Sequence, residues 1–105
     1  MRARLPDRRH HELLEIEHDG IHYIVGIGRF QNGEPAEIFL NASKTGTAAA
    51  VNAQDAAIAA SLLFQHGCPT EMLRKALTRN PDGSAAGPLG AVLDLLHHNP
   101  GETAK

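Results

Sequence analysis

Polar residues that could bind a phosphate ester gather in the C-terminal half of the chain, at Arg74, Lys75, Arg79, Asn80, Asp82 and Ser84. Arg74 and Arg79 could bind phosphate oxygens bidentately, because a guanidinium group presents a planar fork of donors. Asn80 and Ser84 could hydrogen-bond a base or a ribose. Alternatively, Arg74 and Lys75 form the solvated face of a helix and residues 80–83 form a turn. With both alternatives open, we predict Arg74, Arg79, Asn80 and Ser84 as ligand-binding residues.

A second candidate anion site is the stretch Ser43-Lys44-Thr45-Gly46, which precedes a long expected helix. Backbone N–H groups and the helix dipole favour a phosphate at a helix N-terminus, and Lys44 would supply a counter-charge. The upstream glycines of a Walker loop are absent. The alternative is that Thr45 or Thr47 caps the helix. Lys44 and Thr45 therefore join the predicted ligand-binding residues.

The seven histidines and the single cysteine form no pattern typical of catalysis or metal binding. His10-His11 and His97-His98 are adjacent pairs, and neighbours on a helix point about 100° apart, unlike the i, i+4 pairs that share a metal ion. Cys68 has His66 as its nearest base in sequence and no acidic residue to orient that base. We therefore expect a non-catalytic protein without a metal site or a cofactor.

Composition is typical of one small globular domain. The chain has 105 residues, of which 42% are hydrophobic and 21% are charged, and its net charge is −2. This charge gives no general attraction to nucleic acid or to a membrane surface. One cysteine allows no intramolecular disulfide, and no apolar stretch approaches the roughly 20 residues of a membrane span. We expect a cytoplasmic protein that does not contact membranes.

Two dipeptides, Asp19-Gly20 and Asn32-Gly33, predict β-hairpins with two-residue turns, because such turns need positive φ at both central positions. The first turn places Ile16 opposite Tyr23, and the second continues the sheet in a compatible register. Both registers put the same apolar residues on one face of an antiparallel meander, namely Leu14, Ile16, Ile21, Tyr23, Val25, Ile27, Ile38 and Leu40.

The other face of this predicted sheet mixes apolar and charged residues. Ile24, Phe30 and Phe39 lie on it, and Gly26 opposite Phe39 lets the ring lie over bare backbone. A face in contact with water alone would be more polar, so we expect another subunit or a ligand to cover part of it.

Three helices are expected after the meander. Residues 47–66 form a long Ala-rich helix that Gly67 closes and that packs between the sheet and a neighbour. Thr70 is expected to cap a helix over 71–78, and Pro88 to begin another over 89–98. The apolar residues expected to supply bulk or to face inward on these helices are Val51, Ile58, Leu62, Phe64, Met72, Leu73, Leu77, Leu89, Val92, Leu93 and Leu96.

The predicted fold is therefore α+β. A three-stranded antiparallel meander, with a fourth strand left open, packs against the long Ala-rich helix and two shorter C-terminal helices. One domain covers residues 12–98, between a basic N-terminal arm over 1–11 and a polar tail over 99–105.

Several segments resemble, in order and spacing, the TSCPD domain. They are Gly33-Glu-Pro-Ala-Glu-Ile-Phe-Leu40, Ala56-Ala-Ile-Ala-Ala-Ser-Leu-Leu63, Gln65-His-Gly67, Leu77-Thr-Arg-Asn80, Asp82-Gly-Ser84 and Gly90-Ala-Val-Leu-Asp94. This domain occurs at the C-terminal end of cobalamin-dependent ribonucleotide reductases and as short stand-alone bacterial and phage proteins. The resemblance covers about residues 8–96 and implies a small α+β module linked to nucleotide metabolism. The reductase barrel and its cysteines are absent, so reduction of ribonucleotides is not implied.

Three functions are compatible with these observations. The first is a non-catalytic module that binds a nucleotide, or a nucleotide-containing partner such as a ribonucleotide reductase. The second is a phage-type sponge that sequesters a nucleotide-derived immune signal, such as a cyclic ADP-ribose isomer or a cyclic oligonucleotide. The third is a dimerisation or assembly module without a small ligand. We expect a homodimer formed through the face of Ile24, Phe30 and Phe39 or through the Ala-rich helix.

Overall fold

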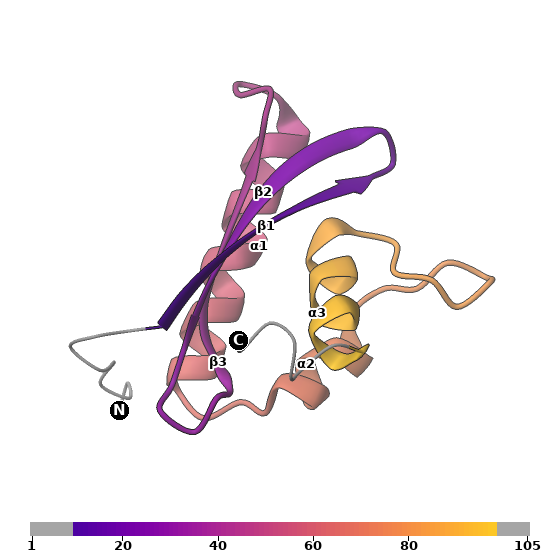
Figure 1. Cartoon of the computed structure of the whole chain (residues 1–105). Helices are drawn as coiled ribbons and strands as arrows, with labels where there is room; N and C mark the ends of the chain where they lie inside the picture. The colour runs from indigo at the N-terminus through magenta and orange to yellow at the C-terminus, as the bar shows by residue number, and fades with distance from the viewer. Residues whose placement is uncertain (1–9, 99–105) are drawn as a thin grey trace.

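The computed structural model describes residues 10–98, shown in Figure 1. The elements follow one another as β1 (His10–His18), β2 (Ile21–Arg29), β3 (Pro35–Ala42), α1 (Ala48–Gln65), α2 (Thr70–Ala76) and α3 (Pro88–His98). The three strands form one antiparallel sheet in the order β1-β2-β3, so the predicted α+β class is confirmed. The described residues contain no fourth strand.

The boundaries of the predicted domain need one change. His10 and His11, assigned above to the N-terminal arm, belong to β1 and pair with Arg29 and Gly28. The rest of the arm, residues 1–9, and the predicted tail over 99–105 lie outside the described residues.

The molecule has two layers. The long helix α1 packs along β3, and α3 lies beside α1 under the same face of the sheet, with α2 next to α3 (Figure 1). The sheet residues that were predicted to share one apolar face do so, and the core lies between that face and the helices. Its buried members are Tyr23, Val25, Ile27, Ile38, Leu40, Ala42, Ala50, Ala53, Ala57, Ala60, Phe64, Leu89, Val92, Leu93 and Leu96.

The first hairpin has the predicted turn. Asp19 and Gly20 both adopt positive φ, at 52° and 78°, and Ile16 lies opposite Tyr23. An aspartate tolerates this left-handed conformation better than most side chains do, and glycine adopts it without strain. The two-residue turn therefore fixes the register of β1 against β2.

The second hairpin is different from the prediction. Only Gly33 has positive φ, at 91°, and its N–H donates to the Phe30 carbonyl at 2.9 Å. The Phe30 N–H donates in turn to the Glu34 carbonyl, so the loop has three residues, a common alternative for Gly at this position. A register shift between Gly28 and Arg29 compensates for the extra residue, and Ile27 still lies opposite Ile38 as predicted.

The outer face of the sheet carries exposed apolar side chains. Leu13, Ile24 and Phe39 are 78%, 45% and 49% exposed, whereas Phe30 is half-buried in the second hairpin. A Cβ at Gly26 would lie 3.3 Å from Phe39 Cδ2, so the predicted packing of this ring over Gly26 is confirmed.

The helix α1 is one residue shorter at each end than the predicted helix over 47–66. Thr47, rather than Thr45, is the N-cap, and its side chain accepts a hydrogen bond from the Ala50 N–H at 3.1 Å. Gly67 closes the helix with φ of 93°. A row of alanines and Phe64 face the core, whereas Val51, Ile58 and Leu62 are 50%, 58% and 43% exposed on the side of α1 away from it.

The two shorter helices depart from the prediction at their ends and at Met72. Pro69 is the N-cap of α2 and makes no side-chain capping bond, while Thr70 is the first helical residue. The helix ends at Ala76 because Leu77 is extended, with ψ of 154°. Met72 is 62% exposed instead of facing inward. The predicted inward face of α3 is buried, and none of the helices over 10–98 has the length and hydropathy to cross a membrane.

Candidate ligand pocket

An apolar cavity of about 390 Å³ opens between the first hairpin, the first half of α1 and the start of α3. Tyr23 from β2 and Leu89 from α3 form two of its walls, and Ala49, Ala53 and Ala56 line it from α1. We call this cavity the apolar pocket.

The pocket remains open because small side chains line it at positions where larger side chains would fill the space. Ala49, Ala53 and Ala56 recur at the spacing of one helix face, so no large side chain projects from that part of α1. On the opposite side Gly90 allows close approach of the preceding loop, because a Cβ there would lie 3.1 Å from Ala85 Cβ. Gly87 also lines the cavity, and nothing lies within 4 Å of a Cβ built on it.

Four polar residues line the apolar pocket: His18, Asp19, Asn52 and Thr78. The His18 Nε2–H donates to the Ala86 carbonyl at 3.1 Å, which ties the first hairpin to the segment before α3. This bond leaves Nδ1 of a neutral ring as an acceptor. The lining residues include one carboxylate and neither lysine nor arginine, so the pocket suits an uncharged body with hydrogen-bonding edges better than a phosphate.

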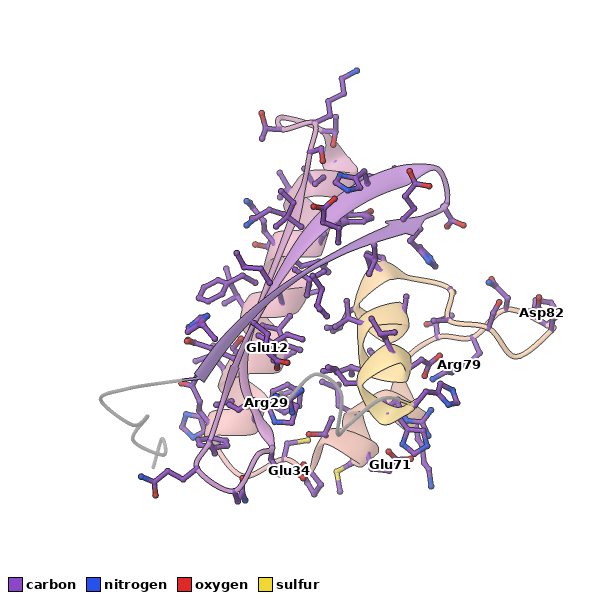
Figure 2. All side chains as sticks on the ribbon, viewed as in Figure 1. Glu12, Arg29, Glu34, Glu71, Arg79 and Asp82 are labelled. Atoms are coloured by element: carbon purple, nitrogen blue, oxygen red, sulfur yellow. The ribbon has the colours of Figure 1, made fainter. Side chains whose placement is uncertain are left out.

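The predicted arginines converge on a carboxylate that sequence analysis did not single out. Arg79 Nη2 lies 2.7 Å from Asp94 Oδ1, and its Nη1 contacts Asp94 Oδ2. Arg74 Nη1 lies 3.0 Å from the same Oδ1, while Nε and Nη2 of Arg74 donate to the two carboxylate oxygens of Glu71 on α2. Asp94 therefore joins α2 and the hairpin after it to α3. Figure 2 shows Arg79 near α3 and Asp82 at the far tip of the hairpin.

The carboxylates and arginines of this cluster shift one another's pKa values, although the positive charge of Arg74 opposes that of Arg79. Hydrogen bonds from Arg79 lower the pKa of Asp94 to about 2, against the opposing effect of burial and with a further contribution from Arg74. The same contact with Asp94 raises the pKa of Arg79. The hydrogen bond from Arg74 lowers the pKa of Glu71. Most guanidinium donors of the two arginines already bond to protein groups. Together with Glu71 and Asp94, the two arginines therefore form an ion-pair cluster within the protein.

Asn80 and Ser84 face each other in a small hairpin. The Asn80 N–H donates to the Ser84 carbonyl at 2.8 Å, and Asn80 Nδ2 lies 3.1 Å from Ser84 Oγ. The Ser84 hydroxyl donates to Asp82 Oδ1 at 2.6 Å, and this bond lowers the pKa of Asp82. These contacts are those of a turn with polar side chains, the structural alternative considered for this segment.

Lys44 and Thr45 lie far from the arginines along α1. Both are exposed in the loop before α1, whereas α2 and Arg74 follow its other end (Figure 1). The structure thus brings Arg74 together with Arg79, and Asn80 with Ser84, but it separates Lys44 and Thr45 from both pairs. None of the six predicted ligand-binding residues lines the apolar pocket.

A second cavity, of about 620 Å³, lies between the second hairpin, α2 and α3. Charged residues of both signs line it, and most contact one another. Arg29, only 6% exposed, bonds to Glu12 at 2.7 Å and to the Gly33 carbonyl, and His97 Nδ1 lies 3.4 Å from Glu71 Oε1. Figure 2 shows Arg29 beside Glu12 on the sheet and Glu71 across from it. Because charges of both signs line this cavity and most of them pair with protein groups, it has no single charge with which to select a ligand.

Among residues 10–98, no three or more His, Cys, Asp and Glu side chains are placed to hold a metal ion together. Comparisons of the chain with protein-family models, with curated proteins and with solved structures found no match.

Proposed function

We propose that this chain is a non-catalytic module that binds a nucleoside-like small molecule in the apolar pocket. The observation that carries this proposal is the pocket itself, an open apolar cavity of about 390 Å³ with a few polar groups on its walls. Small-molecule sites typically have volumes of about 300–1,000 Å³ and the same balance of apolar surface and sparse hydrogen-bonding groups.

The lining favours a flat heterocycle with hydrogen-bonding edges. Alanines of α1 and the Tyr23 and Leu89 side chains offer apolar surface to the faces of such a ring. His18 and Asn52 offer an imidazole nitrogen and an amide to its edges. Asp19 disfavours an anion inside the pocket, so phosphates of a nucleotide would lie outside the lining. The resemblance to the TSCPD domain supports the same class of ligand.

Two neighbouring alanines provide a matched test of this site. Ala49 lines the apolar pocket, whereas Ala48 is exposed and does not. We expect Ala49→Leu to weaken binding of the best ligand in a panel of nucleosides and nucleotides by at least about tenfold, and Ala48→Leu to leave it unchanged. Isothermal titration calorimetry measures both. Flat traces for every member of the panel, or equal effects of the two variants, would contradict the proposal.

The fate of the ligand tests the non-catalytic character that two possible cellular roles share. A module that acts with a ribonucleotide reductase, and a sponge that sequesters a nucleotide-derived signal, would both release the bound molecule unchanged. Mass spectrometry of the molecule recovered after denaturation tests this, and a chemically altered molecule would contradict both non-catalytic roles. The lone Cys68 supports placing the module in a reducing compartment, the cytoplasm.

A further inference from the structure

The two edges of the sheet differ in whether their outward backbone groups are hydrogen-bonded. At the β3 edge, Ser61 Oγ of α1 accepts a hydrogen bond from the Ile38 N–H at 2.8 Å and lies 3.2 Å from the Ile38 carbonyl. The Gln65 side chain, 1% exposed, donates to the Ala36 carbonyl at 3.0 Å. Side chains of α1 thus occupy the groups with which another strand would pair, and the β3 edge is blocked.

The β1 edge has no such cover within residues 10–98. In a two-residue hairpin the residues that flank the turn, here His18 and Ile21, exchange both of their backbone hydrogen bonds. The pattern alternates along the strand, so the residues of β1 that direct their N–H and C=O groups away from β2 are His11, Leu13, Glu15 and Glu17. No group of the described residues bonds to these outward amides.

We propose that β1 pairs with β1 of a second copy of this chain, antiparallel and centred on Leu13, to form a continuous six-stranded sheet. Leu13 is 78% exposed, the highest value among the exposed large hydrophobic residues of the described chain. Pairing about a two-fold axis places Leu13 opposite Leu13 of the second copy and satisfies the outward amides of His11, Leu13 and Glu15 in both strands.

The row of side chains that crosses the sheet at Leu13 supports this centre. Leu13 lies opposite Gly26, and Gly26 lies opposite Phe39. A Cβ on Gly26 would meet Phe39 Cδ2 at 3.3 Å and Leu13 Cδ2 at 3.7 Å, so both side chains lean over the bare glycine. Joining two copies at Leu13 makes one apolar row across all six strands, from Phe39 to Phe39 of the second copy.

Charges in β1 favour the same register. With Leu13 at the centre, His11 lies opposite Glu15 of the second copy on both sides of the axis, so no two carboxylates face each other. Within one chain His11 Nε2 lies 3.3 Å from Glu37 Oε1, and His22 Nε2 lies 2.8 Å from Glu15 Oε1. A sheet centred on Glu15 would place that carboxylate opposite itself, which is destabilising. A sheet centred on Leu14 would place Leu13 opposite Glu15 and leave the apolar row interrupted.

The outward amide of Leu13 gives a direct test with the full chain. Leu13→Pro removes this N–H without removing a bond to β2, and an edge strand tolerates proline at such a position. Leu13→Val keeps the amide and the β propensity. In sedimentation experiments we expect a dimer for the wild type and for Leu13→Val, and at least about tenfold weaker dimerisation for Leu13→Pro. A wild type that is monomeric up to its solubility limit, or a dimer unaffected by Leu13→Pro, would overturn the proposal.

Cross-linking tests the register even if the proline variant does not fold. In a Cys68→Ser background, Leu13→Cys places two thiols at the two-fold axis, whereas Glu17→Cys places them far apart. We expect mild oxidation to give a covalent dimer with the first variant and a much slower reaction with the second. Equal rates for the two variants would exclude the register centred on Leu13.

Discussion

Replacing Asp94 with asparagine removes the charge that Arg74 and Arg79 share and keeps the size of the side chain. The wild-type pKa falls from an ordinary value of 3.8 to about 2. At about 1.4 kcal/mol per pKa unit, this difference corresponds to at most about 2.5 kcal/mol of folding free energy. The Asp94 side chain is 22% exposed, so water screens part of the interaction. We expect Asp94→Asn to lower the free energy of unfolding at pH 7 by about 1–1.5 kcal/mol.

Urea denaturation followed by circular dichroism at several pH values provides the assay. The folded state holds Asp94 at a lower pKa than the unfolded state, so its contribution is complete above about pH 4 and is lost as the pH falls toward 2. The lowered pKa of Glu71 adds to the loss of stability in acid in both proteins. The difference between the two curves isolates Asp94 and should shrink below pH 4. Equal stability at pH 7, or a difference that does not change with pH, would refute the reasoning.

The same pair of proteins separates the two roles considered for the arginines. If Asp94 occupies a position where a phosphate would otherwise bind, inorganic phosphate should stabilise Asp94→Asn more than the wild type, because the variant frees donors of Arg79. If the arginines are structural only, phosphate should have the same small effect on both proteins. Thermal denaturation over a phosphate titration at constant ionic strength distinguishes these outcomes.

Two other predictions concern the sheet. Glu12→Gln should lower the free energy of unfolding in urea by about 3 kcal/mol, because it removes the 2.7 Å carboxylate partner of the buried Arg29. Glu12→Leu combined with Arg29→Met should restore most of this stability, and a double variant as unstable as Glu12→Gln would argue against a charge effect. Gly28→Ala should lower the free energy of unfolding by about 1 kcal/mol, because the new Cβ would lie 2.9 Å from Glu37 Cγ. Gly87→Ala, with open space around its Cβ, should change this free energy by less than about 0.5 kcal/mol. Equal melting temperatures of the two alanine variants would show that Glu37 moves without cost.

Local signals predicted most of the fold. Asp19-Gly20 has one favoured turn, and the alternation of apolar residues on both sides of it admits one register. Asn32-Gly33 is compatible with more than one loop length. The predicted register of β2 against β3 is correct because the shift between Gly28 and Arg29 compensates for the extra loop residue. At α2 the sequence offers Thr70 as a cap, but Pro69 already has the extended backbone that precedes a helix.

The candidate sites could not be predicted as readily, because they depend on packing between distant segments. Arg79 and Asp94 are separated by a hairpin and part of a helix, and only the docking of α3 brings them together. A residue that can bind phosphate can equally bind an internal carboxylate, so residue type alone does not distinguish the two. The apolar pocket depends on residues that lack large side chains, and the only signal for it was the helical spacing of Ala49, Ala53 and Ala56 facing Gly87.

The two proposals involve separate parts of the first hairpin, and this separation makes each testable without the other. Pairing centred on Leu13 uses residues 10–16 of β1, whereas the apolar pocket begins at His18 and continues through Tyr23. A proline at Leu13 acts on the free edge and leaves the bond between His18 and Ala86 in place. Leu13→Pro should therefore weaken the dimer by at least about tenfold and retain ligand binding, while Ala49→Leu should weaken ligand binding and retain the dimer. If both variants lose both properties, the site is shared between two copies and the pocket of one chain is incomplete alone.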